Sequence, residues 1–232
     1  PLMNWRWSAL DTITLISNSD AHSPQKLGME ANVMQFSNER DITYDEIMRI
    51  LREGDKEKFL YTIEFYPEEG KYHLDGHRLC KFFCEPEETK RRGGMCPKCK
   101  KPLVVGVMHR VNDLADRSRD AARHGRKIPY KSLVPLPEIL SDTLGCGVQS
   151  KRVKEAYDAL IKNVGNEFFI LLHADCAAIA RASSPQIAEA VKRVRAGNIV
   201  IEPGYDGVFG VVKVFGEGEG RGQPRQTSLT LE

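Results

Sequence analysis

His77-Arg78-Leu79-Cys80 begins and ends with a residue that can bind a metal ion, and two residues separate them. Further along the chain, Cys96-Pro97-Lys98-Cys99 repeats this spacing. Such a gap lets a tight turn aim both side chains and its backbone amides at one ion, and Pro97 suits such a turn. Imidazole and thiolate groups in two such pairs are the donors of a tetrahedral zinc site. The stretch therefore predicts a zinc-knuckle or zinc-ribbon module with a structural Zn²⁺ bound by His77, Cys80, Cys96 and Cys99.

Cys84 leaves a second assignment open, because Cys80-x-x-x-Cys84 could supply the first pair and leave His77 outside the site. The spacing favours His77. The thiols could instead be packed as apolar residues or bridged as a disulfide, but the two pairs flank a Gly- and Lys-rich loop that is poor in core-forming residues. Paired cysteines in a chain of 232 residues indicate a metal site in a reducing compartment, so we expect a cytoplasmic protein.

The most apolar runs of the chain, residues 168–172 and 208–215, are too short to cross a bilayer. They are typical of core elements. We therefore expect no membrane span.

Charge is segregated along the chain, although its formal net value is only +2. Residues 30–88 hold 15 acidic and 8 basic side chains, whereas residues 89–131 hold 13 basic and 3 acidic ones. The second segment, called the basic block below, is typical of a surface that contacts phosphates, or else of a solvated face balanced by the acidic segment beside it. The candidate DNA-binding residues in this block are Lys90, Arg91, Arg92, Lys98, Lys100, Lys101, Arg110, Arg117, Arg119 and Arg123.

Polar residues follow a short β-branched run near the start of the chain. Residues 12–16 predict a buried strand, and Asp20 and His22 come directly after it. Loops after the strands carry the chemistry of parallel α/β barrels, and both side chains could bind a divalent ion. The alternative is that Asp20 caps a turn and His22 is an ordinary loop residue.

The remaining patterns predict a mixed α+β protein. We expect a helix over 43–53 and a strand over 59–66, then, after the zinc module, a basic helix over 109–123. Helices are predicted over 136–144, 150–164, 167–182 and 184–196, and a β-hairpin from 198–201 and 208–215. The expected domains are residues 1–66, 67–126 and 127–232, of which the last few form a tail or a cloning scar.

Several of these motifs are familiar in combination. Ser19-Asp20-Ala21-His22-Ser23-Pro24, followed by Lys26-Leu27-Gly28 and Glu30-Ala31-Asn32, resembles the last metal-binding motif of the polymerase-and-histidinol-phosphatase (PHP) superfamily. Tyr72-His73-Leu74, the His/Cys knuckles, residues 106–116 and Pro203-Gly204-Tyr205-Asp206-Gly207 resemble endonuclease Q, in the same order. The resemblance covers nearly the whole chain and implies a terminal βα unit of a PHP barrel, the zinc module and a helical C-terminal domain.

The resemblance implies a DNA repair endonuclease that cleaves 5′ to deaminated bases such as uracil or hypoxanthine. Asp20 and His22 match the final ligand pair of the family's cluster of divalent ions, which would be Zn²⁺, Mn²⁺ or Mg²⁺. The family's earlier ligands, including an opening His-x-His, would lie before Pro1. We therefore expect this chain to supply zinc-stabilised DNA binding and to be inactive alone. The resemblance does not say whether a replication clamp or another repair protein is a partner.

Two other functions stay open at this point. One is a noncatalytic, zinc-containing nucleic-acid-binding or helicase-associated module, although no nucleotide-binding loop is present. The other is a PHP-type phosphoesterase of a small metabolite, which the basic block disfavours because such a substrate needs only a local anion site.

Overall fold

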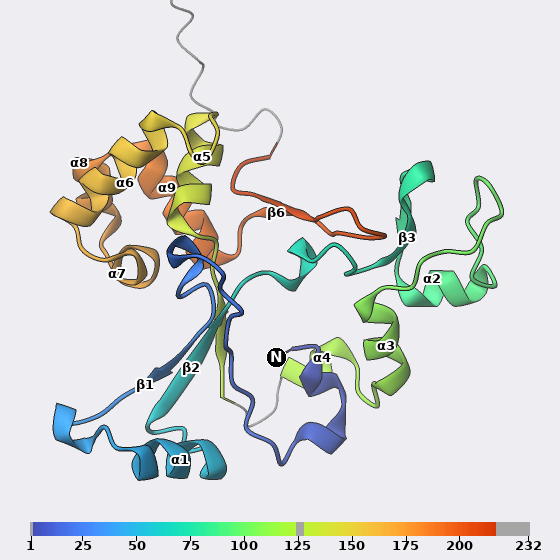
Figure 1. Ribbon diagram of the computed structural model, residues 1–232, viewed down its shortest axis with the longest axis horizontal. Helices are drawn as coiled ribbons and strands as arrows, with labels where there is room; N and C mark the ends of the chain where they lie inside the picture. The colour runs from blue at the N-terminus through green and yellow to red at the C-terminus, as the bar shows by residue number, and fades with distance from the viewer. Residues whose placement is uncertain (1, 124–127, 217–232) are drawn as a thin grey trace, which may run out of the picture. The chain divides into compact units, whose positions relative to one another are not determined.

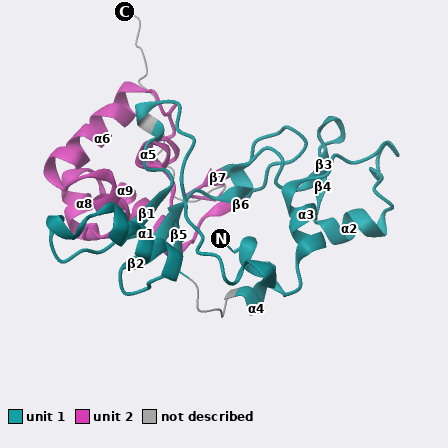
Figure 2. Ribbon diagram, turned by 60° about the horizontal axis from the view of Figure 1, so that its bottom comes forward, with its two compact units in different colours: residues 1–132, 202–211 teal, residues 133–201, 212–232 magenta. Residues whose placement is uncertain are grey.

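The computed structural model describes residues 2–123 and 128–216, which form two compact units. Unit 1 comprises Pro1–Ser132 and Glu202–Val211, and unit 2 comprises Leu133–Ile201 and Val212–Glu232 (Figure 2). Helices and small sheets alternate along the chain (Figure 1), so the predicted α+β class is confirmed. The three expected domain segments stay a prediction, since the compact units group the first two with the residues around 202–211.

Unit 1 contains a three-stranded sheet in the order β1-β2-β5. Strand β1 (Ala31–Met34) is antiparallel to β2 (Phe59–Glu64), with Ala31 opposite Ile63, and β5 (Tyr130–Ser132) is parallel to β2. Two 3-10 turns, η3 (Pro24–Lys26) and η4 (Glu39–Asp41), flank β1.

Helix α1 (Tyr44–Glu53) confirms the helix expected over 43–53. The Thr43 hydroxyl caps its first turn by accepting a hydrogen bond from the Glu46 amide, and Gly54 ends it at a φ of 60°. Ile50 is fully buried and packs with Phe59 of β2 and Ile128 in one apolar cluster. The sequence pattern thus located both the helix and the strand that covers its apolar face.

The strand expected over 12–16 is wrong, because these residues form turns and irregular backbone. Ile13 and Ile16 are half exposed. Just beyond them, the Asn32 side chain bonds both the amide and the carbonyl of Ser17 at 2.9 Å. A side-chain amide therefore takes the backbone groups with which a strand at this edge would pair.

Between β2 and β5 along the chain, unit 1 contains a β-hairpin followed by short helices. Strands β3 (Asp75–His77) and β4 (Phe82–Cys84) are antiparallel, and the 3-10 helix η6 (Arg78–Cys80) connects them. Helix α2 (Pro86–Arg91) follows, and Val104 then returns to pair with Gly76 of β3. The 3-10 turn η5 (Pro67–Glu69) precedes this module, and η1 (Asn4–Arg6) and η2 (Ser8–Leu10) open the unit.

The single basic helix expected over 109–123 is also wrong. It is two helices, α3 (Val107–Leu114) and α4 (Arg119–Arg123), separated by extended backbone at Ala115. The amides of Asp116 and Arg117, at 3.0 and 3.2 Å, donate to the Arg6 carbonyl rather than continuing a helix. Tertiary contacts with the start of the chain therefore override the local helical pattern.

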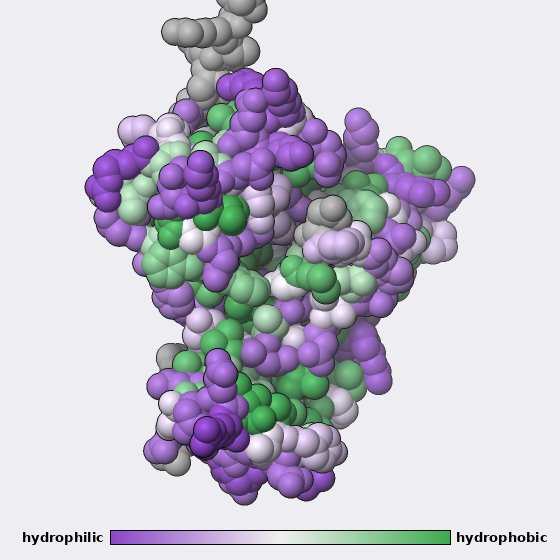
Figure 3. Space-filling model, turned by 60° about the vertical axis from the view of Figure 1, so that its left-hand side comes forward, coloured by the Kyte–Doolittle hydropathy of each residue, from purple (hydrophilic) through white to green (hydrophobic). Residues whose placement is uncertain are grey.

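Unit 2 is built mainly from helices, namely α5 (Leu136–Leu144), α6 (Lys151–Asn163), α7 (Glu167–Leu172), α8 (Cys176–Ala182) and α9 (Pro185–Ala196). Leu140, Leu160, Ile170 and Ile179 are fully buried between them. Hydrophilic residues cover much of their outer surface, at the upper left of Figure 3. No described helix combines the length and the hydropathy of a membrane span.

Two expectations for this part of the chain, one helix and one β-hairpin, differ from the structure. The helix expected over 167–182 is wrong as one element, because α7 ends where the amides of His173 and Ala174 both bond the Phe169 carbonyl. The expected hairpin is present as β6 (Val200–Glu202) and β7 (Val211–Lys213), with shorter strands than predicted. Its tip carries Asp206 and Gly207 at positive φ, as a tight hairpin turn requires.

Candidate metal centre and pocket

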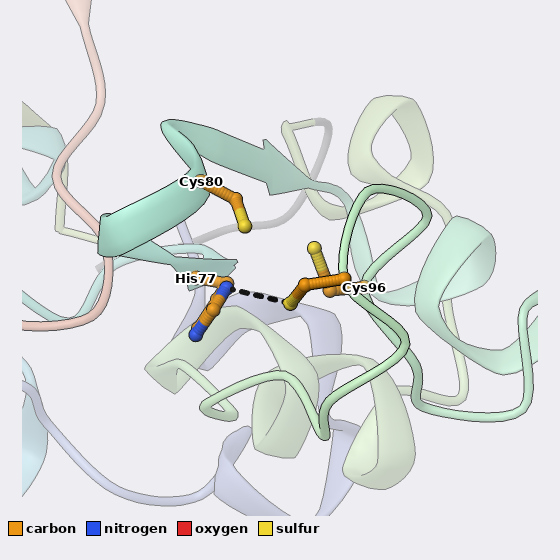
Figure 4. A group of neighbouring side chains, drawn as sticks. His77, Cys80 and Cys96 are labelled. Atoms are coloured by element: carbon orange, nitrogen blue, oxygen red, sulfur yellow. Dashed lines mark hydrogen bonds between the residues drawn. The ribbon is translucent and has the colours of Figure 1, made fainter.

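The structure brings four of the predicted ligands together. The ligand atoms of His77, Cys80, Cys96 and Cys99 all lie within 4.8 Å of one another (Figure 4). His77 ends β3 and Cys80 ends η6, after which Lys81 reverses the chain at a φ of 47°. On the opposite side, the Lys100 amide bonds the Cys96 carbonyl at 2.9 Å, which closes the turn that presents both cysteines. We call these four residues the metal centre.

The thiols of the metal centre differ in acidity. Burial opposes ionisation of Cys96, but the backbone amides of Cys99 and Lys98 direct hydrogen bonds at its sulfur and hold its pKa at about 6. A hydrogen bond with Cys99, burial and the neighbouring Cys96 raise the pKa of Cys80 to about 11. Like charges on adjacent sulfurs disfavour each other, and a bound cation would relieve that repulsion.

The donor set fits zinc. With Zn–S near 2.3 Å and Zn–N near 2.0–2.1 Å, the edges of a tetrahedral site are roughly 3.3–3.8 Å long. The Cys99 sulfur lies 3.4 Å from the His77 Nδ1 nitrogen (dashed in Figure 4), which is within that range. In the described part of the chain, no other group brings three or more His, Cys, Asp or Glu ligand atoms together.

Cys84 lies outside the metal centre. Its sulfur contacts the Thr89 hydroxyl at 3.3 Å, and burial raises its pKa. Across the β3–β4 pair it faces Asp75 rather than the other thiols. The geometry therefore favours His77 over Cys84 as the fourth ligand.

A buried acid next to the metal centre was missed by the sequence reasoning. Asp75 is fully buried, and its carboxylate accepts the Gly106 amide at 2.7 Å and contacts the His109 Nδ1 nitrogen at 2.5 Å. It thereby ties β3 to the start of α3. Nothing in the sequence points to this pairing, because 34 residues separate Asp75 from His109.

Asp20 and His22 lie in an irregular loop beside a pocket of about 580 Å³. Their side chains are 100% and 84% exposed, and the His22 Nδ1 nitrogen contacts the backbone carbonyl of Asp20 at 2.7 Å. The pocket is further lined by Glu30, whose pKa is raised by burial and by the charge of Glu64. The complete lining is Ser19, Asp20, Ala21, His22, Ser23, Lys26, Met29, Glu30, Phe65, Glu69, Gly70, Phe209 and Gly210.

Half of the candidate DNA-binding residues are ion-paired within unit 1. Lys90 pairs with Asp113 at 2.6 Å, Arg117 with Asp11 at 2.6 Å, and Arg119 with Glu85 at 3.4 Å. Arg91 and Arg92 both pair with Glu88. Arg91, Arg92 and Arg119 thus pair with the acidic segment, as the alternative expects, whereas the partners of Lys90 and Arg117 lie outside residues 30–88.

The other candidates differ from these five. Lys98 donates to the Cys80 carbonyl at 2.8 Å. Lys100, Lys101 and Arg110 are exposed and make no ion pair within the described residues. The Arg123 side chain lies outside the described part of the structure.

Comparison with known proteins identifies the fold. A lesion-specific endonuclease from Pyrococcus furiosus, PfuEndoQ, superposes with a TM-score of 0.80 at 29% identity, over 92% of this chain and 52% of that one. An endonuclease Q bound to a 27-mer duplex substrate with an abasic lesion at its active site superposes with a TM-score of 0.74 at 29% identity, over 94% of this chain and 54% of that one. This chain resembles endonuclease Q. The resemblance predicted from the motifs is thus confirmed.

Sequence comparisons agree with the resemblance to endonuclease Q. Residues 135–198 match the family model described as the MJ0043 C-terminal domain. The uncharacterized protein MJ0043 of Methanocaldococcus jannaschii is 33% identical over 207 residues, which are 88% of this chain and 26% of that protein. YqxK of Bacillus subtilis is 27% identical over 89% of this chain and 48% of its own length. The chain therefore spans about half, or less, of the proteins it matches.

Proposed function

We propose that this chain is part of a DNA repair endonuclease of the endonuclease Q type, which cleaves 5′ to deaminated bases such as uracil or hypoxanthine. The observation that carries the proposal is the superposition of 92% of the chain on a lesion-specific endonuclease with a TM-score of 0.80. A second neighbour was solved with a DNA duplex, which supports DNA as the partner.

The metal centre has a structural role in this proposal. His77, Cys80, Cys96 and Cys99 would hold a Zn²⁺ ion, which joins the β3–β4 hairpin to the loop that follows α2. Of the four ligands, only Cys96 is fully buried. In this proposal the bound ion cross-links the β3–β4 hairpin to the loop that follows α2, and the four ligands thereby fix the position of the basic block.

Asp20 and His22 would contribute to a second, divalent-ion site that belongs to the PHP part of the protein. A carboxylate and an imidazole are ordinary ligands of Zn²⁺ and Mn²⁺, while Mg²⁺ prefers carboxylate and water oxygens. Two ligands do not hold a catalytic cluster, and no third predicted ligand joins them among the described residues. We therefore expect the isolated chain not to cleave DNA.

Lys100, Lys101 and Arg110 are the best candidates for phosphate contacts. They are exposed and free of ion pairs in the described structure, so binding a phosphate would not require breaking an existing pair. Lys100 and Lys101 directly follow Cys99, which makes their placement dependent on the metal centre. DNA binding should therefore weaken both with added salt and with loss of the metal.

Fluorescence anisotropy with two labelled duplexes tests the proposal. The duplexes have the same sequence, except that one carries a single deoxyuridine in place of thymidine. We expect salt-dependent binding with a preference for the deoxyuridine duplex, and no nicking by the isolated chain when Mn²⁺ is added. Nicking of the uracil-containing strand would show that the two ligands suffice, and absence of any DNA binding would refute the proposal.

A noncatalytic nucleic-acid-binding module is the second candidate. The observation in its favour is that four ligand atoms gather at the metal centre, whereas no third ligand joins Asp20 and His22 among the described residues. The same titrations separate the two, because such a module would bind both duplexes equally at every salt concentration.

A further inference from the structure

The tip of the β6–β7 hairpin, residues 204–208, lies against β3 and the residues that precede it (Figure 1). The Leu74 amide donates to the Gly204 carbonyl at 3.0 Å. The Gly207 amide donates to the Lys71 carbonyl at 2.9 Å. These residues, called the hairpin tip below, therefore dock on the segment that leads into the metal centre.

One side chain of the hairpin tip supports the first ligand pair of the metal centre. The Asp206 carboxylate accepts a hydrogen bond from the Arg78 amide at 2.7 Å, across 128 positions of the sequence. Arg78 begins η6, the turn between His77 and Cys80, and the His77 side chain does not cap that turn. Because the first amides of a helix lack partners within it, Asp206 supplies an acceptor that the ligand turn does not provide for itself.

A ring of the hairpin tip holds the strand just before His77. Tyr205 lies on Gly76, where an added Cβ would be 2.4 Å from an atom of the Tyr205 ring. The same ring packs against Phe83, with the two centroids 4.9 Å apart, and Phe83 faces Gly76 across β3 and β4. The missing side chain at position 76 therefore leaves the space in which Tyr205 fixes the backbone that leads to His77.

The second ligand pair is supported differently. Its turn is closed by its own neighbours, since the Cys96 amide donates to the Lys101 carbonyl at 2.8 Å and the Lys100 amide donates to the Cys96 carbonyl at 2.9 Å. The metal centre thus joins one turn that is closed locally to one turn that the hairpin tip supports. In metal sites, contacts that orient the ligands from outside change metal affinity by roughly 10–100-fold.

We propose that Asp206 and Tyr205 are positioning residues of the metal centre, and that zinc binding and docking of the hairpin tip strengthen each other. With both its ligands engaged, η6 keeps the shape that Asp206 contacts, and Asp206 in turn keeps the shape that presents His77 and Cys80. Such coupling acts equally in both directions. Loss of the ion should release the hairpin tip, and loss of the tip contacts should weaken zinc binding.

The coupling gives the metal centre influence over a segment far from its own motifs. The hairpin tip belongs to residues 202–211, which return to unit 1 between two stretches of unit 2 along the chain. The inference requires that the metal centre binds zinc, but not that the chain binds or cleaves DNA.

Zinc affinities of the whole chain, measured by competition with a chromogenic chelator, test the role of Asp206. Glycine and asparagine both suit the positive φ of 43° at this position, and both remove the negative charge. Asparagine alone keeps an acceptor oxygen. We expect Asp206→Gly to bind zinc about 10–100-fold more weakly than the wild type, and Asp206→Asn to recover most of that loss.

The role of the Tyr205 ring is tested in the same assay. Tyr205→Phe should keep the wild-type zinc affinity, because the ring still packs on Gly76 and Phe83. Tyr205→Ala should lower the affinity, because the backbone before His77 loses this contact. Circular dichroism of the zinc-loaded proteins should show that all the variants are folded.

Hydrogen exchange of the wild type, with zinc and after its removal by excess chelator, tests the reverse direction. Peptides that cover residues 204–208 should exchange faster without zinc. Peptides from α1, residues 44–53, are the control and should exchange at the same rate in both states. This measurement needs no variant, so it decides the proposal even where a substitution prevents folding.

The inference is overturned if Asp206→Gly or Tyr205→Ala binds zinc as tightly as the wild type, or if Asp206→Asn recovers nothing. Equal exchange of residues 204–208 with and without zinc would also overturn it. A wild type that binds no zinc would overturn it together with the structural role of the metal centre. None of these results depends on DNA, so the proposed nuclease function is tested separately.

Discussion

The metal centre and the Asp20–His22 pair are both built from ligand residues separated by short gaps, yet they differ in completeness and in burial. The metal centre gathers four donor atoms within 4.8 Å, and Cys96 is fully buried. Asp20 and His22 are almost fully exposed in an irregular loop. The difference shows that ligand spacing supplies candidates, whereas a second segment that folds onto the first completes a site.

The supporting contacts differ in the same way. Beneath the metal centre, Asp75 ties β3 to α3 through the Gly106 amide and His109. Asp20 and His22 contact mainly each other through His22 Nδ1 and the Asp20 carbonyl. We therefore expect the first site to bind its ion in the isolated chain and the second to bind none tightly.

The largest effect should follow from Cys96→Ala. Structural zinc sites contribute apparent binding free energies of about 10–16 kcal/mol, so loss of a buried ligand should abolish tight metal binding and unfold the module around β3 and β4. Elemental analysis should fall from one zinc per chain to none. Cys84→Ser is the control and should retain the metal, and a loss of zinc there would make Cys84 the ligand in place of His77.

A smaller effect is expected for Gly210→Ala. The added Cβ would lie 2.0 Å from the Glu68 carbonyl oxygen, so the loop has to move, at a cost of about 1–3 kcal/mol in the free energy of unfolding. Thermal and denaturant unfolding should show this loss of stability, while the zinc content stays at one ion per chain. Gly147→Ala is the matched control, because nothing lies within 4 Å of its added Cβ. Equal stability of the two variants would contradict the close packing of this loop.

Next in size is the effect of Lys100→Ala combined with Lys101→Ala on DNA binding. Removing two phosphate contacts should lower the slope of log affinity against log salt by about 1.8. Lys90→Ala should change the slope less, since Lys90 is already paired with Asp113 at 2.6 Å. An unchanged slope in the double variant would move the phosphate-binding surface away from the metal centre.

The smallest effect should come from Asp20→Ala combined with His22→Ala. Both side chains are exposed and make few contacts, so stability and tightly bound metal should stay at the wild-type level. Calorimetric titration with Mn²⁺ should show weak binding at most in either protein. Tight Mn²⁺ binding by the wild type, lost in the variant, would show that two ligands hold an ion here.

Local signals in the sequence located a large part of this structure. The helices predicted over 43–53 and 184–196 match α1 and α9 closely. Thr43 and Ser184 cap their first turns, Gly54 and Gly197 end them, and such caps depend on neighbours only a few positions away. Local periodicity failed over 12–16 and 109–123. Just beyond the first stretch the Asn32 side chain bonds the Ser17 backbone, and within the second the Arg6 carbonyl accepts the amides of Asp116 and Arg117.

The metal centre could be read from residue types and spacing, since a two-residue gap fixes where a pair of ligands points. The pocket could not. Its wall joins the loop of Asp20 to Phe65 and to Phe209, which lie far apart along the chain. Backbone hydrogen bonds from Gly204 and Gly210 to the carbonyls of Glu68 and Glu69 hold the loop of Phe209, and such bonds leave no side-chain pattern from which this contact could be foreseen.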